Sequence, residues 1–298
     1  PPAPAEATGK RIAVVGGGPS GLTAAYYLQL MGHSVTVFEQ RDRLGGMLRY
    51  GIPDYRLPPE VLQKDIDYIL KTGVEVKTGV CIGTDIQVEQ LRRDYDALYV
   101  AIGAHADKKL GLPGEDSENV LSAVEFLRDC GEGHPLDFTG KRVVVIGGGN
   151  VSMDATRTAI RLGAESVTCV YRRRIDDMTA LPEEIADAQA EGCQILPLQA
   201  PHRIEAGEDG NVAALWTKPQ IIGSYGRDGR PAPRNAAERE FRIPCDYLII
   251  AIGQRIESDN FEKEGIETSR GALKADLTGY VPGTPNVFAG GDAVTGPA

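Results

Sequence analysis

The feature that most constrains the fold of this 298-residue chain is an internal duplication. The segment KRIAVVGGGPSGLTAAYYLQLMGHSVTVFEQRDR at 10–43 reappears as KRVVVIGGGNVSMDATRTAIRLGAESVTCVYRRR at 141–174. Each copy combines a β-branched strand, a glycine turn, a helix and a second strand, which is the pattern of a βαβ unit. So long a repeat period indicates two related α/β domains and not a solenoid.

The expected strands and helices place the second domain inside the first. In the first copy we expect a strand, a glycine turn, a helix and a second strand over Arg11–Val15, Gly16–Gly21, Leu22–Met31 and Ser34–Glu39. The similar segments 95–104 (YDALYVAIGA) and 245–254 (CDYLIIAIGQ) would close the two halves with one strand each. A last strand within 286–298 has no helix of its own, so we expect it to return to the first domain. The stretch Glu205–Arg242 contains glycines, prolines and scattered polar residues, and we expect hairpin and loop there.

The first glycine turn has the sequence and the context of a dinucleotide-binding loop. Gly16-x-Gly18-x-x-Gly21 follows a strand and opens a helix. Glycines at these positions allow a tight turn, close approach of the backbone to a pyrophosphate, and close packing of the helix on the strand. Glu39 ends the second strand, where a carboxylate can accept hydrogen bonds from both hydroxyls of an adenosine ribose. Together these features favour a nucleotide site over a purely structural turn.

The second glycine turn differs from the first at the positions that select the nucleotide. It keeps Gly147 and Gly149 but has Ser152 at the third position, and Tyr171 stands where the first copy has Glu39. The next three residues, 172–174, are all arginines, at the place where a ribose 2′-phosphate would lie. This arrangement favours NADP(H) over NAD(H), and the alternative is a solvated basic turn.

Composition argues against several other classes of protein. Lys and Arg number 32 against 42 Asp and Glu, a net charge of −10 without a long basic stretch, so nucleic acid is not an expected partner. Apolar segments fall short of the ~18 residues of a membrane helix and no signal peptide is visible, so we expect a cytoplasmic protein without membrane contact. The five cysteines form no Cys-x-x-Cys pair, and the four histidines have no metal-ligand spacing, so neither a dithiol relay nor a metal site is expected.

Seven motifs together resemble one family of flavoproteins. The motifs are RLGGMLRYGIPDYRLP at 43–58, AIGA at 101–104, GGGNVSMD at 147–154, YRRR at 171–174, LPEE at 181–184, AIGQ at 251–254 and FAGGDA at 288–293. They resemble the small subunit (β-chain) of NADPH-dependent glutamate synthase. Its relatives include the flavin/NADPH part of dihydropyrimidine dehydrogenase and the large subunit of the ferredoxin–NADP transhydrogenases. The resemblance runs from about Lys10 to the end of the chain.

The resemblance implies an FAD-dependent NADPH oxidoreductase with two Rossmann-like domains, in which NADPH passes a hydride to FAD. The residues implied for FAD are Gly16, Gly18, Pro19, Ser20, Gly21, Glu39, Gly46, Met47, Gly103, Gly291 and Asp292. Those implied for NADPH are Gly147, Gly149, Asn150, Val151, Arg172 and Arg173. No catalytic side chain is expected, because hydride transfer to a flavin needs orientation and the cofactor supplies the reactivity.

The composition of the first residues, the two repeats and the last strand indicate how the domains divide the chain. We expect a linker-like tail at 1–9, the FAD-binding domain at 10–105 and 250–298, and the NADP(H)-binding domain at 106–249. Members of the family usually carry an iron–sulfur domain upstream and a further helix downstream, so the sequence is interpreted as a fragment truncated before that helix. Electrons would leave to a partner subunit or iron–sulfur domain, such as a glutamate synthase large subunit or a ferredoxin.

Two other hypotheses remain open from the sequence. One is a redox-inactive nucleotide-binding module that serves in the assembly of a larger complex. The other is an enzyme of the same fold that prefers NADH. The residues do not decide the final electron acceptor, the direction of electron flow or the oligomeric state, since partner contacts are usually surface patches without a motif.

Overall fold

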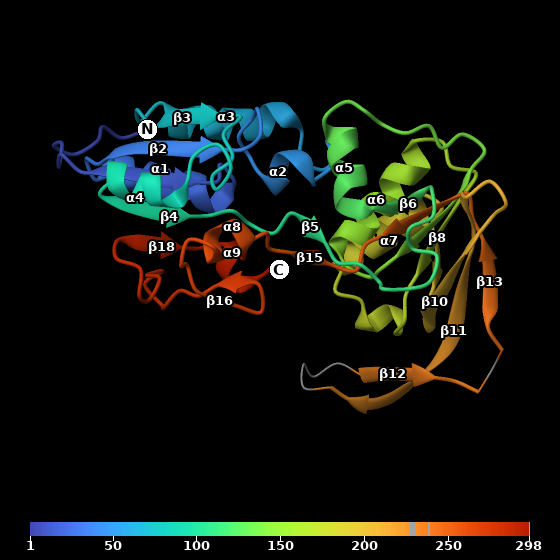
Figure 1. Cartoon of the computed structure of the whole chain (residues 1–298). Coiled ribbons are helices and arrows are strands. Elements are labelled where there is room, and N and C mark those ends of the chain that lie inside the picture. The colour runs from blue at the N-terminus through green and yellow to red at the C-terminus, as the bar shows by residue number, and fades with distance from the viewer. Residues whose placement is uncertain (227–230, 238, 298) are drawn as a thin grey trace. The chain divides into compact units, whose positions relative to one another are not determined.

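The chain forms two compact units, each built around a parallel sheet (Figure 1). The computed structural model describes residues 1–226, 231–237 and 239–297. The first unit comprises Pro1–Ala106 and Gln254–Ala298, and the second is Asp107–Gly253. The first unit is therefore assembled from two stretches of sequence that the second unit separates.

The first unit contains a five-stranded parallel sheet of order β18-β4-β1-β2-β3. Its strands are β1 (Arg11–Val15), β2 (Ser34–Glu39), β3 (Glu75–Thr78), β4 (Ala97–Val100) and β18 (Val287–Ala289). In Figure 1 the red strand β18, from the end of the chain, lies beside the green-blue strand β4. The last described strand therefore completes the sheet that the first strands begin.

The helices of the first unit are mostly short. They are α1 (Pro19–Leu30), α2 (Met47–Tyr50), α3 (Pro59–Leu70), α4 (Val88–Asp94), α8 (Asp259–Glu262) and α9 (Asp292–Thr295). Two small two-stranded sheets complete the list of elements: β5 (Ala106–Asp107) with β15 (Gln254–Arg255), and β16 (Thr268–Ser269) with β17 (Ala272–Leu273). Helix α1 begins three residues earlier than expected, because proline at the first helical position fits the helix and lacks only an N–H that would be unpaired there.

The second unit repeats the parallel sheet, in the order β6-β14-β7-β8-β9. Its strands are β6 (Val120–Ser122), β7 (Arg142–Ile146), β8 (Ser166–Val170), β9 (Gln194–Leu196) and β14 (Tyr247–Ile250). Its helices are α5 (Ala123–Gly131), α6 (Asn150–Arg161) and α7 (Pro182–Ala190), with a 3-10 turn at Ile175–Asp177.

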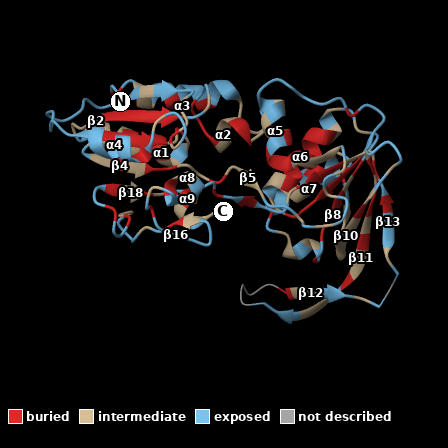
Figure 2. Cartoon of the chain, in the orientation of Figure 1, coloured by how far each residue is buried: buried red, intermediate tan, exposed pale blue. Residues whose placement is uncertain are grey.

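Both parallel sheets are covered on both faces, because successive apolar residues of their central strands enter two different apolar clusters. In β1, Ala13 and Val15 enter one apolar cluster while Ile12 and Val14 enter another. Strand β7 does the same in the second unit, where alternate residues from 143 to 146 divide between two clusters. Side chains of a strand point alternately to its two faces, so a continuous apolar run indicates a strand buried on both. Figure 2 shows β2 as buried over most of its length, and only its first residue, Ser34, is exposed.

An antiparallel sheet covers one face of the second parallel sheet. It consists of β10 (Gln199–Ala206), β11 (Val212–Tyr225), β12 (Pro231–Asn235) and β13 (Phe241–Pro244). Ile204, Leu215 and Ile243 from this sheet share an apolar cluster with Val144 and Leu248 of the parallel sheet. The stretch expected to be hairpin and loop is thus mostly sheet, because its inward-facing apolar residues are buried only once the two sheets pack.

Residues 1–9, expected to be linker-like, make ordered contacts in the first unit. The N–H groups of Ala5 and Thr8 donate to the carbonyls of Leu30 and Gly32, both at 2.9 Å. Gly32 has φ +88°, and a Cβ there would overlap the carbonyl oxygen of Glu6. The tail therefore packs against the turn after α1, which its content of Pro and Ala did not predict.

Candidate functional site

The first glycine loop is closed by backbone contacts that leave no room for side chains. A Cβ on Gly16, which has φ +106°, would overlap the carbonyl oxygen of Ala101, and a Cβ on Gly21 would overlap that of Gly16. At Gly18 the situation is reversed, because an added Cβ would have only the Cα of Gly46 nearby, at 3.7 Å. The first and third glycines thus allow close packing, while Gly18 presents open backbone to a ligand.

The start of helix α1 offers unpaired donors beside this open face. Among the described residues, the N–H groups of Gly18, Ser20 and Gly21 donate to no partner. Pro19 occupies the first turn, which contains no acidic residue. Unpaired amides and the positive end of the helix dipole favour a bound anion such as a pyrophosphate.

Gly17 of this loop is held by Glu39 and by the segment that carries Gly46 and Met47. One carboxylate oxygen of the buried Glu39 accepts from the Gly17 N–H at 2.8 Å and the other from the Arg41 N–H at 2.9 Å. The Gly17 carbonyl in turn accepts from the Gly45 N–H at 2.8 Å. An ionised carboxylate has about four acceptor positions, so Glu39 can still accept from ribose hydroxyls.

The turn after β18 brings Gly291 and Asp292 to the same glycine loop. The Gly290 N–H donates to the Val100 carbonyl at 3.1 Å, and a Cβ on Gly291 would lie 2.7 Å from the Cβ of Ser20. Asp292 is half-buried, and its carboxylate makes no hydrogen bond or ion pair with any described residue. Sequence positions about 270 residues apart therefore meet at one nucleotide loop, as the strand pairing β18–β4 requires.

Gly103 lies in the chain that leaves β4 beside the loop. The Ala101 N–H donates to the Val15 carbonyl at 2.8 Å, and the Ala101 carbonyl is the group that excludes a side chain at Gly16. Gly103 itself has φ +66°, a conformation that favours glycine. Its backbone therefore follows directly on the segment that closes the first glycine loop.

The second glycine loop, in the other unit, has the same architecture with one substitution. Gly147 is again in contact with a carbonyl, that of Ala251, and a Cβ there would also overlap Oγ of Ser152. Ser152 is fully buried and its hydroxyl donates to the Ala251 carbonyl at 3.3 Å, so a serine fits where the first loop needs a glycine. The N–H groups of Gly149 and of the next two residues, 150 and 151, donate to no described residue, which again leaves an anion site at a helix start.

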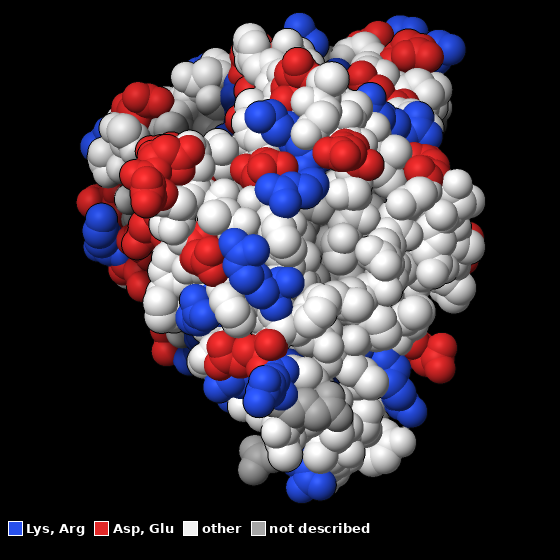
Figure 3. All heavy atoms as spheres, turned by 90° about the vertical axis from the view of Figure 1, so that its right-hand side faces the viewer, with Lys and Arg blue, Asp and Glu red and all other residues white. Residues whose placement is uncertain are grey.

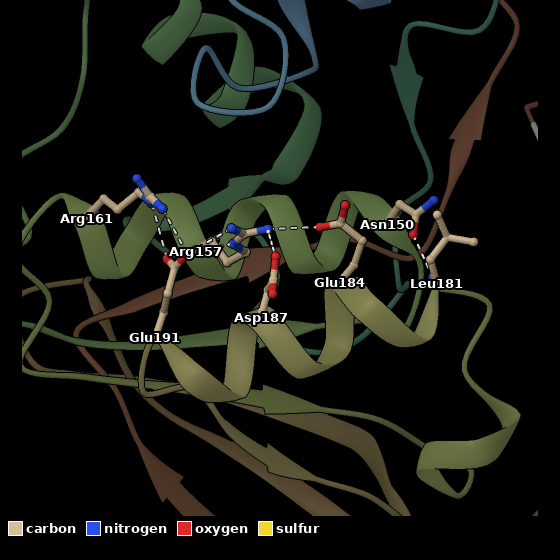
Figure 4. Close-up of polar contacts among 7 residues, drawn as sticks. All are labelled: Asn150, Arg157, Arg161, Leu181, Glu184, Asp187 and Glu191. Atoms are coloured by element: carbon tan, nitrogen blue, oxygen red, sulfur yellow. Dashed lines mark hydrogen bonds and ion pairs between the residues drawn. The ribbon is translucent and has the colours of Figure 1, made fainter.

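Segment 179–181 lies against this second loop. The N–H groups of Thr179 and Ala180 both donate to the Gly148 carbonyl, at 2.9 and 3.0 Å. The side-chain oxygen of Asn150 accepts from the Leu181 N–H at 2.9 Å (Figure 4). Asn150, expected to bind the cofactor, thus already uses its oxygen within the protein and keeps its amide donors for a ligand.

The three arginines at 172–174 have three different environments. Arg172 is exposed and makes no hydrogen bond or ion pair with any described residue. Arg173 is buried, and its Nε donates to the Pro231 carbonyl at 2.9 Å. Arg174 forms a two-pronged pair with Asp177, both distances 2.9 Å, and its hydrogen bond lowers the pKa of that carboxyl. Arg172 is therefore the member of the triplet whose guanidinium is available to a phosphate.

Tyr171 fills the space that Glu39 has in the first unit. A Cβ on Gly148 would lie within 2.6 Å of two carbons of the Tyr171 ring, so the ring packs directly on the glycine loop. Its hydroxyl donates to the Asp177 carbonyl at 2.8 Å. No carboxylate thus stands at this position to repel a phosphate on the ribose.

Most of the thiols are buried, and burial raises their pKa. Desolvation brings the pKa of Cys130 and Cys193 to about 11 and that of Cys245 to about 12, and it raises the pKa of Cys169 further. A thiol with a raised pKa is a poor nucleophile at neutral pH. The described cysteines are free thiols, and the described residues contain no cluster of three His, Cys, Asp or Glu side chains able to hold a metal ion.

The face of the molecule that carries the antiparallel sheet mixes charges of both signs (Figure 3). Arg242 pairs with Glu205 at 2.8 Å, and Glu240 lies within 3.8 Å of both Arg203 and Lys218. Figure 3 also shows a broad area of this face without charged side chains. Among the described residues, no helix has the length and hydropathy needed to cross a bilayer.

Comparison with known proteins places the chain in a family. The model of the pyridine nucleotide-disulphide oxidoreductase family matches residues 10–298. A putative glutamate synthase (NADPH) small chain from Cereibacter sphaeroides is 34% identical over 99% of this chain and 74% of its own length. The NADP(+)-dependent formate dehydrogenase subunit beta of Moorella thermoacetica is 39% identical over 97% of this chain, which spans only 41% of that relative.

Solved structures show the same fold at lower identity. FprA from Mycobacterium tuberculosis in complex with NADPH has a TM-score of 0.81 and 22% identity, covering 97% of this chain and 80% of that structure. Thioredoxin reductase from Lactococcus lactis has a TM-score of 0.70 and 21% identity, covering 96% and 90%. These matches confirm the predicted α/β fold with two dinucleotide-binding domains.

The family match also confirms the resemblance to glutamate synthase small chains. At the level of the family it confirms the expected enzyme class, a flavoprotein oxidoreductase with FAD and NADP(H) as cofactors. The chain belongs to the pyridine nucleotide-disulphide oxidoreductase family.

Proposed function

We propose that this chain is the FAD- and NADPH-binding part of an oxidoreductase that delivers electrons from NADPH to a partner. The observation that carries the proposal is the unlike chemistry of the two nucleotide loops. The first has the buried carboxylate Glu39 at the ribose position, and the second has the uncharged Tyr171 followed by the exposed Arg172. Such a pair suits one nucleotide without a 2′-phosphate and one that carries it.

The first unit fits FAD. Its pyrophosphate would lie against the open backbone at Gly18 and the unpaired amides at the start of α1. Its ribose hydroxyls would donate to the carboxylate of Glu39. The carboxylate of Asp292, which has no partner among the described residues, would accept hydrogen bonds from the ribityl or pyrophosphate region. We propose the remaining FAD contacts at the backbone of Pro19, Gly46, Met47, Gly103 and Gly291.

The second unit fits NADPH. The amides of Gly149, Asn150 and Val151 would hold its pyrophosphate, and Arg172 its 2′-phosphate. Arg173 would support this site through its hydrogen bond to Pro231 and not as a primary phosphate ligand. Gly147 would serve the tight turn.

The residues of this chain bind and orient, while the bound flavin supplies the chemistry of accepting a hydride. The family name refers to disulphides, but this sequence has no Cys-x-x-Cys, and four of its five thiols have a pKa raised by burial. We therefore propose that electrons leave the flavin for a partner subunit or iron–sulfur domain and not for a cysteine pair. The subunit names of the relatives, small chain and subunit beta, support such a partner.

An absorption spectrum tests the proposal. The full-length protein is purified, and its visible spectrum is recorded before and after anaerobic addition of NADPH, with NADH as the control. We expect a flavin band that NADPH bleaches faster than NADH. A protein that holds flavin but is bleached by neither nicotinamide would refute the proposal. A protein that stays colourless after reconstitution with FAD would favour the redox-inactive assembly module.

A further inference from the structure

We propose that Arg157 is a positioning residue for the NADP(H) site, because it holds α7 on α6 and so keeps segment 179–181 on the glycine loop. The inference rests on the proposed function of the second unit and deepens it. Arg157 lies two turns after the loop along α6, and it has no place among the residues implied by the family resemblance. It would act through the protein and not by touching the cofactor.

Arg157 is a buried cation surrounded by the acidic face of α7 (Figure 4). Its Nη1 lies 3.0 Å from Glu184 Oε2 and 3.3 Å from Asp187 Oδ2, and its Nη2 lies 2.9 Å from Glu191 Oε1. The spacing of these acids along the chain places them on one side of a helix. A buried guanidinium is tolerated only when it is paired in this way, so the two helices are held in one arrangement.

Helix α7 itself contributes little apolar surface. Ala188 is the fully buried residue of this nine-residue helix, and Ile185 is partly buried. The cluster around Ala188 consists of Met153, Cys169, Ala180 and Cys193, with Ile160, Met178 and Ile195 partly buried against it. Four of the other eight residues of α7 are polar, and two of these, Glu184 and Asp187, face Arg157. The ion pairs of Arg157 are therefore a principal attachment of α7 to α6.

The N-terminal end of α7 is the segment that touches the loop. Leu181, the N-cap of α7, donates to Asn150, and the two residues before it donate to the Gly148 carbonyl. A trans peptide is planar, so its carbonyl and the following N–H point in opposite directions. The Gly148 carbonyl is held toward segment 179–180, so the Gly149 N–H points away from it and stays available to a phosphate.

The experiment compares full-length, FAD-loaded protein carrying Arg157→Met, Glu184→Gln or the control Arg161→Met. Arg161 lies on the same helix and pairs with the same Glu191, at 2.8 Å, but its side chain is 47% exposed, whereas Arg157 is buried. Calorimetry gives the NADP⁺ dissociation constant, and initial rates give KM and kcat with NADPH and with NADH. Circular dichroism and flavin content report whether each variant is folded.

We expect Arg157→Met to weaken NADP⁺ binding about tenfold, the loss that follows when one hydrogen bond to a charged phosphate is displaced. The KM for NADPH and for NADH should rise by the same factor with kcat at saturation unchanged, because the loop holds the pyrophosphate common to both. Glu184→Gln should also raise the NADP⁺ dissociation constant. Arg157→Lys should bind NADP⁺ more tightly than Arg157→Met, and the dissociation constant of Arg161→Met should stay within twofold of the parent value.

The inference is overturned if folded Arg157→Met and Glu184→Gln proteins bind NADP⁺ as the parent does, or if Arg161→Met weakens binding equally. It is also overturned if kcat falls and flavin is lost while KM stays constant. Where Arg157→Met does not fold, Glu184→Gln decides by the same criteria. Failure of the unmodified protein to bind NADP⁺ would instead refute the proposed function, and the inference with it.

Discussion

Replacing Arg172 by alanine should remove most of the expected preference for NADPH, so that kcat/KM becomes similar for NADPH and NADH. Arg172 is exposed and makes no hydrogen bond or ion pair with the described residues, so its removal should not disturb the fold. A hydrogen bond between charged groups contributes about 1.5–3 kcal/mol, and solvent screening of an exposed arginine favours the lower end. Since about 1.4 kcal/mol corresponds to a factor of ten, the KM for NADPH should rise about tenfold.

The assay for this prediction is the ratio of kcat/KM for NADPH to that for NADH, measured with FAD-loaded full-length protein at low and high salt. The matched control is Arg174→Ala, because Arg174 is already paired with Asp177 and should contribute little to the ratio. An Arg172→Ala protein with the parental ratio would refute the assignment of the 2′-phosphate site. If this ratio depended on salt as strongly in Arg172→Ala as in the parent, the proposed charge interaction between Arg172 and the 2′-phosphate would be refuted.

Three further predictions follow from the described contacts. Gly21→Ala should lower the free energy of unfolding by about 1–3 kcal/mol, because its Cβ would overlap the Gly16 carbonyl, and an unchanged denaturant midpoint would contradict that packing. Glu39→Gln should reduce the flavin retained after gel filtration while leaving NADP⁺ binding intact; retention at the parental level would remove Glu39 from the FAD site. Hydrogen bonds from Arg242 and Trp216 lower the pKa of Glu205 to about 2, so the stability that it adds should be present above its unfolded pKa of ~4.3 and be lost as pH falls toward 2. Acid titration followed by fluorescence of the single tryptophan checks this, with Glu205→Gln as the variant that should show no such transition.

Local patterns were sufficient for the two parallel sheets and the two glycine loops. The expected strands Arg11–Val15 and Ser34–Glu39 have the observed bounds, because a β-branched run between a charged residue and a glycine turn leaves little freedom in where a strand ends. The family is likewise determined by short motifs. These features depend on neighbours in sequence.

Only the tertiary structure decided which environment each of several similar residues occupies. Arg172, Arg173 and Arg174 are identical in sequence terms, but the first makes no bond with a described residue, the second is buried against Pro231 and the third pairs with Asp177. The same holds for the antiparallel sheet over 199–244, whose apolar residues find their partners on the parallel sheet. Such outcomes depend on contacts between segments far apart in the chain, which no local pattern contains.

The pairing of Arg157 with the acids of α7 likewise depends on tertiary packing and not on sequence periodicity. Periodicity alone places an arginine on α6 and acids on α7, as on many solvated helices. The packing of the two helices is what buries the arginine and pairs it with these acids, and we propose that this pairing supports the second glycine loop. The sequence by itself determined which dinucleotide loops this protein has, and tertiary packing decided which side chains hold those loops in place, because burial and pairing exist only in the folded chain.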